Sequence, residues 1–221
     1  MLTWTSGRFH DGGVHNQDAI AVVLADDSDH FRRGLSAVLA TDDRIQVVGQ
    51  ACNGEELIEL VGRVVPDVAV VDLRMPGTGG VAATRAIRAA SPVTRILVLT
   101  ISDEDDDLFD AIVAGANGYL LKETAIDDMP DAILTVTNGG APLSPPMAAA
   151  LWREYSGLLA AGRVPAVLRP REERALRMLS EGASTATIAT GLGLSQTVVE
   201  RELSDALEKV RLVGGVGRSG P

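Results

Sequence analysis

The chain has 221 residues and a net charge of −10, with 30 acidic and 20 basic residues. This length allows one large domain or two modest ones and is enough for a sizeable core. With Cys52 as the single cysteine, a disulfide framework and a cysteine-based metal site are excluded, and a reducing compartment is indicated. No apolar run reaches the ~20 residues of a membrane span. The opening residues lack the features of a signal peptide, so we expect a cytoplasmic protein with no membrane partner.

Charge is distributed unevenly along the chain. Residues 18–138 contain 21 acidic and 9 basic side chains, a balance of −12, whereas residues 166–221 contain 7 acidic and 8 basic ones, a balance of +1. Such asymmetry predicts two domains with different partners. We expect a flexible tail over 1–17, an α/β domain over 18–138, a linker with a helix over 139–165, and a small helical domain over 166–221.

Strand-like and helix-like patterns alternate through the first domain. Five stretches have a helical pattern. The first two follow Ser28 and Asn53, which are suited to be N-caps. The third covers residues 81–89, the fourth opens with the acidic run 103–107, and the fifth covers residues 125–137. Apolar runs of strand length occupy 20–25, 45–48, 68–71, 96–99 and 118–121. Five β-α units predict a five-stranded doubly wound parallel sheet, with helices on both faces.

Polar side chains follow four of these strands. They are Asp26 and Asp27, Asp72, Thr100, and Lys122. Chemistry in open α/β sheets lies at the carboxyl ends of the strands, so we expect these residues to share one pocket. Crowded carboxylates need a cation, and hard oxygen ligands suit Mg2+. Asp72 can then act as a nucleophile that carries a phosphoryl group, although each residue alone is equally well explained as a turn former or an N-cap.

Residues 20–138 resemble a receiver domain of two-component signalling. The resemblance is carried by Asp26-Asp27, by the segment 72–77 (Asp-Leu-Arg-Met-Pro-Gly), by Thr100 and by the segment 114–122 ending in Lys122. It implies that Asp72 is the phosphoacceptor, and that Asp26, Asp27, Asp72 and the main-chain carbonyl of Arg74 hold Mg2+. Thr100 and Lys122 would contact the phosphoryl group, and Tyr119 would be the aromatic that reports the state. Gly79 replaces the Asp that is usual in the family, and we expect this to change a helix start and to leave the chemistry intact.

The last segment predicts a helix-turn-helix. Pro170 opens one helix, Ser184 caps a second, and Ser195 caps a third over 198–210, after a turn that contains Gly193. The segments 168–172, 179–182 and 188–195 resemble the LuxR-type helix-turn-helix, and the whole chain resembles NarL/LuxR-family response regulators. The resemblance implies phosphorylation of Asp72 by a sensor histidine kinase, promoter binding and a phosphorylation-linked homodimer. The expected DNA contacts come from Thr185, Ser195, Gln196, Thr197 and Arg201.

The helix-turn-helix also departs from its family. Glu200 and Glu202 occupy positions that are usually Lys and His, so carboxylates would face a polyanion. The fourth helix that the family uses for pairing is hard to see in the glycine-rich residues 213–221. Two hypotheses therefore stand. The chain either regulates transcription through DNA, or it is a phosphorylation-dependent adaptor whose output domain contacts protein. Its pocket supports phosphoryl transfer to and from its own aspartate alone, so an enzyme with another substrate is not expected.

Overall fold

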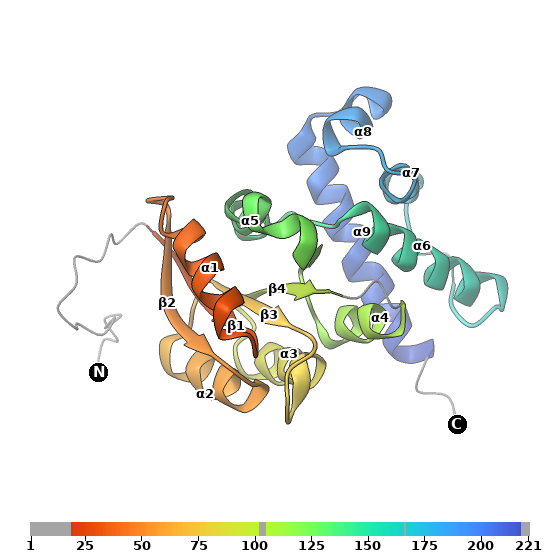
Figure 1. The fold of residues 1–221 in the computed structure, drawn as a ribbon. Helices are drawn as coiled ribbons and strands as arrows, with labels where there is room; N and C mark the ends of the chain where they lie inside the picture. The colour runs from red at the N-terminus through yellow and green to blue at the C-terminus, as the bar shows by residue number, and fades with distance from the viewer. Residues whose placement is uncertain (1–18, 102–104, 166, 218–221) are drawn as a thin grey trace, which may run out of the picture.

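The computed structural model describes residues 19–101, 105–165 and 167–217 (Figure 1). The predicted tail over 1–17 and the first acidic residues of the predicted fourth helix, Asp103 and Glu104, lie outside these ranges. No helix within them is long and apolar enough to cross a membrane.

A five-stranded parallel sheet forms the centre of the first domain, as predicted. Its strands are β1 (Ile20–Ala25), β2 (Ile45–Ala51), β3 (Val68–Asp72), β4 (Arg95–Thr100) and β5 (Gly118–Leu121), in the order β2-β1-β3-β4-β5. All five residues of the central strand β3 are buried, because helices cover both faces of the sheet. Strand β2 runs three residues further than predicted and pairs with β1 as far as Ala51.

Two helices cover one face of the sheet and three cover the other. The first pair is α1 (Asp29–Leu39) and α5 (Lys122–Thr137); the other three are α2 (Gly54–Val64), α3 (Gly79–Ala90) and α4 (Asp105–Ala114). The predicted N-caps are confirmed: Ser28 Oγ accepts from Phe31 N at 3.3 Å, and Asn53 Oδ1 accepts from Glu56 N at 2.9 Å. Helix α3 begins at Gly79, two residues before the predicted start, and the side chain of Thr78 at its N-cap position does not cap it.

The linker continues the sheet. Tyr119 N in β5 donates to Pro142 O at 2.7 Å, and Ser144 N donates to Tyr119 O at 3.2 Å. This short parallel bridge covers the edge of β5 with chain from the linker. Helix α6 (Pro145–Ala160) follows directly and packs against α4 and against the first helix of the output domain.

The output domain contains helices α7 (Pro170–Ser180), α8 (Thr185–Leu192) and α9 (Gln196–Gly217). Gly193, in the left-handed region at φ 66°, forms the predicted turn between α8 and α9. Helix α9 is much longer than the predicted 198–210. It incorporates residues 213–217, so the described part of this domain has no separate fourth helix.

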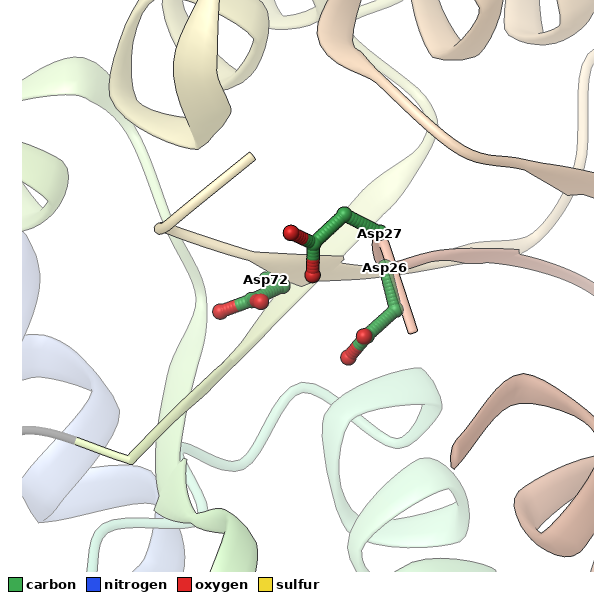
Figure 2. Close-up of side chains that lie close together, drawn as sticks. All are labelled: Asp26, Asp27 and Asp72. Atoms are coloured by element: carbon green, nitrogen blue, oxygen red, sulfur yellow. The ribbon is translucent and has the colours of Figure 1, made fainter. Parts of the chain in front are cut away.

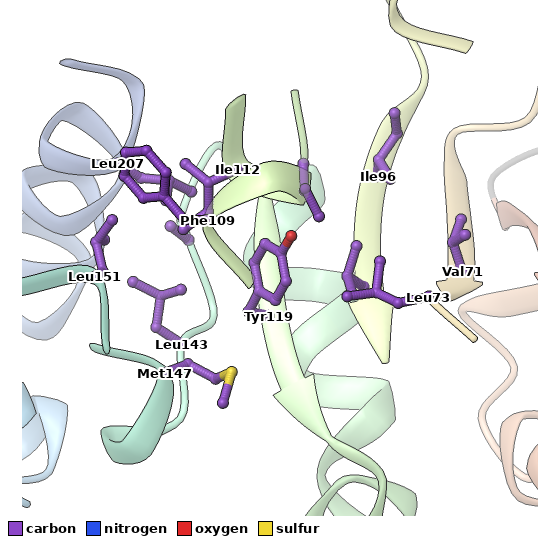
Figure 3. Packing of buried hydrophobic residues seen from close by; sticks show 14 of the residues in the cluster. Val71, Leu73, Ile96, Phe109, Ile112, Tyr119, Leu143, Met147, Leu151 and Leu207 are labelled. Atoms are coloured by element: carbon purple, nitrogen blue, oxygen red, sulfur yellow. The ribbon is translucent and has the colours of Figure 1, made fainter. Parts of the chain in front are cut away.

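Helix α9 also docks on the first domain. A Cβ atom on Gly214 would lie 2.5 Å from Phe109 Cζ, so glycine permits close approach of α9 to α4. Phe109, Leu151 and Leu207 belong to one buried cluster that extends from the sheet through α6 into α9 (Figure 3). The two domains therefore share a continuous apolar core.

Candidate functional site

Three carboxylates meet at the carboxyl ends of neighbouring strands β1 and β3 (Figure 2). Asp26 and Asp27 follow β1, and Asp72 is the last residue of β3. One oxygen from each lies within 4.8 Å of the others. Asp26 and Asp72 are each 3% exposed, whereas Asp27 is exposed to solvent. The strand ends thus bring the three predicted acidic residues together.

Lys122 provides the positive charge of this pocket. Its Nζ lies 2.5 Å from Asp26 Oδ2 and 2.8 Å from Asp72 Oδ2, and it lies 4.7 Å from the centre of the Phe31 ring. Burial disfavours the ammonium form, but the contacts with Asp26 and Asp72 outweigh burial and raise the pKa of Lys122. Lys122 is therefore a fixed cation within the pocket, and its first position in α5 places it there.

Asp72 is held in a partly desolvated position. Burial raises the pKa of Asp72 above its ordinary value, and the nearby charge of Asp26 adds to this, while the hydrogen bond from Lys122 opposes it. Its other oxygen, Oδ1, accepts from Arg74 N at 3.2 Å. The carboxylate is thus oriented by one contact on each oxygen, as a positioned nucleophile requires.

The loop that follows β3 is fixed by contacts that the sequence did not indicate. Glu55, in the first turn of α2, accepts hydrogen bonds from both the main-chain N and the Oγ1 of Thr78. Gly80 packs so closely on β3 that a Cβ atom would lie 2.1 Å from Asp72 O. These contacts hold the turn that carries the main-chain carbonyl of Arg74, one of the predicted metal ligands.

The two remaining residues of the predicted pocket lie on β4 and β5. Thr100 is the last residue of β4 and is 2% exposed, so its side chain is buried at the same edge of the sheet as Asp72. Tyr119 is fully buried, and its main chain makes the two hydrogen bonds to the linker described above. Any displacement of Tyr119 would therefore act directly on the segment that leads into α6.

The carboxylate pocket fits a divalent cation. Three carboxylates share one ammonium, which leaves two negative charges unbalanced. Asp26 Oδ2 is buried and accepts no well-directed hydrogen bond, although it lies in ion-pair contact with Lys122. Oxygen donors of this kind, with one exposed member where water can enter, are the ligands that Mg2+ prefers. Asp26, Asp27 and Asp72 are thus suited to hold the ion.

Comparisons with known proteins agree with this geometry. Residues 22–134 match the response regulator receiver domain. The chain is 32% identical over 212 residues to the transcriptional regulatory protein DegU of Brevibacillus brevis, covering 89% of this chain and 90% of DegU. It is 32% identical over 203 residues to the nitrate/nitrite response regulator NarL of Escherichia coli K12, covering 90% and 93% of the two chains.

The chain belongs to the NarL/LuxR-type response regulators. Its fold is similar to that of the response regulator ChrA of a heme-sensing two-component system (31% identity, TM-score 0.52, covering 87% of this chain and 96% of ChrA). It is also similar to RcsB of Salmonella typhimurium (25% identity, TM-score 0.57, covering 88% and 93%). The regulator therefore works in phosphorylation-based two-component signalling and in the regulation of transcription. Receiver-domain regulators are generally not enzymes.

A second charged cluster lies inside the output domain of the regulator. Glu172 is fully buried and accepts from Lys209 Nζ at 2.8 Å on both oxygens, and from Arg169 N and Nε at 2.6 Å each. Burial disfavours the charged carboxylate, but these donors outweigh burial and lower the pKa of Glu172. The cluster joins the start of α7 to the middle of α9 and so fixes the helix-turn-helix.

The two acidic residues that depart from the family pattern, Glu200 and Glu202, are partly covered in this arrangement. Glu202 is half-buried, and its Oε2 lies 3.5 Å from Arg169 Nη2. Glu200 is also half-buried: a Cβ atom on Gly140 would lie 3.2 Å from Glu200 Cβ, so α9 touches the linker here. Burial raises the pKa of Glu200. In the docked arrangement, contacts with Arg169 and with the linker thus partly cover both residues.

The candidate DNA contacts occupy a different part of the same helix-turn-helix. Four of them are exposed to solvent, and Thr185 is half-buried; the exposed ones are Ser195, Gln196, Thr197 and Arg201. Ser195 caps α9, where Val198 N donates to its Oγ at 3.3 Å. Four of the five predicted contacts thus lie at or near the N-terminal end of α9, whereas Thr185 is the first residue of α8.

Sequence reasoning missed several residues that shape the pocket. Phe31 is one of the apolar residues in the helical pattern after Ser28, and that pattern does not indicate that its ring lies beside Lys122. The Glu55–Thr78 contact joins residues 23 positions apart, and no local pattern indicates such a pair. An acidic residue just after an N-cap is usually explained by the helix dipole, so Glu55 carried no separate signal.

Proposed function

We propose that Asp72 accepts a phosphoryl group from a sensor histidine kinase. An oxygen of the Asp72 carboxylate attacks the phosphorus of a phosphohistidine, a P–O bond forms and the P–N bond breaks. The electron pair of the broken bond returns to the imidazole, which takes up a proton. The observation that carries the proposal is the convergence of three carboxylates and Lys122 at the strand ends.

Each residue of the carboxylate pocket has a role in this transfer. Asp26, Asp27, Asp72 and the main-chain carbonyl of Arg74 would hold Mg2+, which neutralises charge between carboxylate and phosphoryl oxygens. Lys122 already contacts Asp72 and would pair with a phosphoryl oxygen once the carboxylate becomes a mixed anhydride. The Thr100 hydroxyl would donate to another phosphoryl oxygen, and Tyr119 would follow its movement.

We further propose that this chemistry controls the docking of α9. A change at Tyr119 reaches the linker through its two main-chain hydrogen bonds, and α6 follows the linker directly. Helix α6 packs against α4, on which the C-terminal half of α9 is docked. Phosphorylation would thus shift the population from a docked to a released output domain that is free to pair with a second copy.

The released helix-turn-helix would bind promoter DNA through Thr185, Ser195, Gln196, Thr197 and Arg201. Four of these side chains are exposed, and Glu202 is held by Arg169, which removes one carboxylate from the contact face. The adaptor alternative rested on Glu200, Glu202 and the absence of a recognisable fourth helix, and the described part of the output domain has no separate fourth helix. The contact of Glu202 with Arg169 lies within the output domain, so it persists after release and supports the DNA-binding function.

Binding to DNA from upstream of its own gene tests the proposal. Gel shifts before and after treatment with acetyl phosphate and Mg2+ should show phosphorylation-dependent binding by the wild type and none by Asp72→Ala. Intact-mass measurement on the same samples reports phosphorylation separately. An unchanged mass after treatment would refute Asp72 as phosphoacceptor. Phosphorylated protein that binds no DNA at low salt would instead refute the DNA-binding output.

A further inference from the structure

A small recess lies between the receiver domain and α9, far from the carboxylate pocket. Arg95 starts β4 and lines the recess, whereas Thr100 ends the same strand beside Asp72, so the two sites lie at opposite ends of the sheet. The volume of the recess is about 120 Å³. On this measure one water molecule needs only ~10–15 Å³, so the recess has room for a small polyatomic ion.

Both domains contribute to the lining of the recess. The receiver provides Arg88, Arg95, Ala116 and Asn117, and α9 provides Ser204, Leu207, Glu208 and Arg211. Three guanidinium groups and one carboxylate give the lining a charge of +2. The carboxylate of Glu208 lies 3.4 Å from Arg211 Nη2, but its side chain is 65% exposed and so extends largely into solvent. The recess therefore carries an excess of positive charge.

Arg88 is held rigidly at this site. Its Nε and Nη2 donate to Gly115 O at 3.2 and 2.7 Å, Nη2 also donates to Asn117 Oδ1 at 2.5 Å, and Nη1 donates to Pro92 O at 3.1 Å. Burial lowers the pKa of Arg88, and the positive charges of Arg211 and Arg95 lower it further. Like charges are thus brought together across the domain boundary, and their repulsion opposes docking unless an anion lies between them.

We propose that this recess binds a small phosphate-class oxyanion that joins Arg88 and Arg95 of the receiver to Arg211 of α9. The guanidinium groups of Arg95 and Arg211 can match the oxygens of a phosphate with paired hydrogen bonds. Arg88 already donates four of its five N–H groups to the protein and contributes mainly its charge. Hydrogenphosphate carries the two negative charges that the lining lacks. Ser204 adds a hydroxyl donor. A recess of this size admits a free ion or the phosphate end of a small metabolite and excludes the duplex backbone of DNA.

Such an ion would stabilise the docked arrangement. It contacts both domains only when α9 lies on α4, so its binding free energy favours that state over the released one. The ion binds without any contribution from Asp72, because the recess shares no residue with the carboxylate pocket, but its effect rests on the docked and released states proposed above and opposes that of phosphorylation. Phosphate concentration would therefore set how readily the output domain is released, whatever the output domain binds.

Thermal unfolding and titration calorimetry of the full chain test this site, in metal-free buffer with inorganic phosphate or a phosphate monoester. Sodium chloride at matched ionic strength controls for general screening. We expect saturable binding and a melting temperature that rises with phosphate but not with chloride. A phosphate monoester of the same charge as hydrogenphosphate separates the two sources of the ion. Tighter binding of the monoester than of inorganic phosphate would identify a phosphorylated metabolite as the occupant, and equal or weaker binding would identify the free ion.

Single substitutions locate the binding. Arg95→Gln and Arg211→Gln should each weaken phosphate binding by roughly tenfold, as loss of one charge-assisted hydrogen bond predicts. Glu208→Gln should strengthen it, because it removes the one carboxylate of the lining. Arg85→Gln, which changes an exposed arginine of the same helix as Arg88, is the matched control and should leave binding unchanged.

Hydrogen exchange supplies a readout of docking. Phosphate should slow exchange at residues 115–117 and 204–211 in the wild type and not in Arg95→Gln. The proposal is overturned if chloride and phosphate stabilise the protein equally, or if both arginine variants bind phosphate as tightly as the wild type. Binding without slower exchange in these segments would overturn the role of the ion in docking.

Discussion

Each of the two domains places a lysine against buried carboxylate. The buried negative charge is in excess in the receiver and paired in the output domain. In the receiver, Lys122 faces Asp26 and Asp72 with Asp27 close by, so negative charge is in excess. In the output domain, two cations, Lys209 and Arg169, contact the fully buried carboxylate of Glu172, so the buried charge is paired. Arg169 also contacts Glu202 and Asp205, which are less buried than Glu172. The comparison teaches that a buried cluster with unpaired charge indicates a site where ions or chemical groups bind reversibly. A buried cluster whose charges are paired indicates a contact that stabilises the packing of two helices.

The largest expected effect comes from removing the receiver lysine. Lys122→Met leaves the carboxylates of Asp26 and Asp72 buried without their cation, and should lower the free energy of unfolding by about 3 kcal/mol. Lys209→Met is the matched variant. It should cost less, about 1 kcal/mol, because Arg169 still holds Glu172 and Lys209 is less buried. Urea denaturation of both variants measures the difference.

Mg2+ sharpens this test of the charge imbalance. The ion should restore part of the stability of Lys122→Met, because it can neutralise the remaining carboxylates, and should not change Lys209→Met. Equal responses of the two variants to Mg2+ would contradict the assignment of the metal to the receiver pocket.

The second effect concerns the paired cluster of the output domain. Glu172→Gln should lower the free energy of unfolding by about 2 kcal/mol, because the buried carboxylate accepts four charge-assisted or main-chain hydrogen bonds. Folding lowers the pKa of Glu172 below its ordinary value of 4.5. The ionised carboxylate therefore stabilises the folded state at pH values above 4.5, and this stabilisation is lost as the pH falls through the pKa of the folded state. Denaturation at several pH values should show the two proteins converging in acid. A constant difference would argue against an ionised Glu172.

The third effect concerns the docking that connects the two domains. Gly214→Val places a side chain where Phe109 Cζ lies 2.5 Å from the Cβ position, so about 1–2 kcal/mol of docking energy should be lost by overpacking. The variant should bind DNA without phosphorylation if docking holds the output domain back. Gly157→Val on α6, where a Cβ atom meets nothing within 4 Å, is the control. Unchanged small-angle scattering and DNA affinity in Gly214→Val would refute the docking model.

The smallest effect is a gain of stability. Asp72→Asn removes a carboxylate whose pKa is raised chiefly by burial, and should increase the free energy of unfolding at pH 7 by about 1 kcal/mol. A raised folded pKa means that ionised Asp72 destabilises the fold as the pH rises above its ordinary value of 3.8. The difference between wild type and variant should therefore shrink as the pH falls toward that value. A loss of stability at pH 7 would show that the Lys122 contact outweighs burial.

The receiver fold and the residues of its pocket could be predicted because they depend on local pattern and topology. Asp72 and Thr100 each end an apolar strand, and parallel strand ends necessarily share one edge of the sheet. The Glu55–Thr78 contact and the Phe31 ring beside Lys122 could not be predicted in this way. They depend on the mutual packing of helices and loops that are distant in sequence.

The output domain was predicted less completely, for a physical reason. Helix α9 continues through Gly214, which the sequence suggests as a helix breaker. The close contact with Phe109 on α4 requires a glycine at this position, and this tertiary contact overrides the low helix propensity of glycine. The partial burial of Glu200 depends on the linker, and that of Glu202 depends on Arg169. Helical periodicity alone does not specify either neighbour.

The lysine usage of this chain has a chemical consequence. Lys122 and Lys209 are its only lysines, against eighteen arginines, and each is engaged with a buried carboxylate in a different domain. Apart from the amino terminus, an amine-selective acylating reagent therefore meets just two targets, and both are engaged in ion pairs with buried carboxylates. The order in which mass spectrometry finds them modified would report which domain opens first.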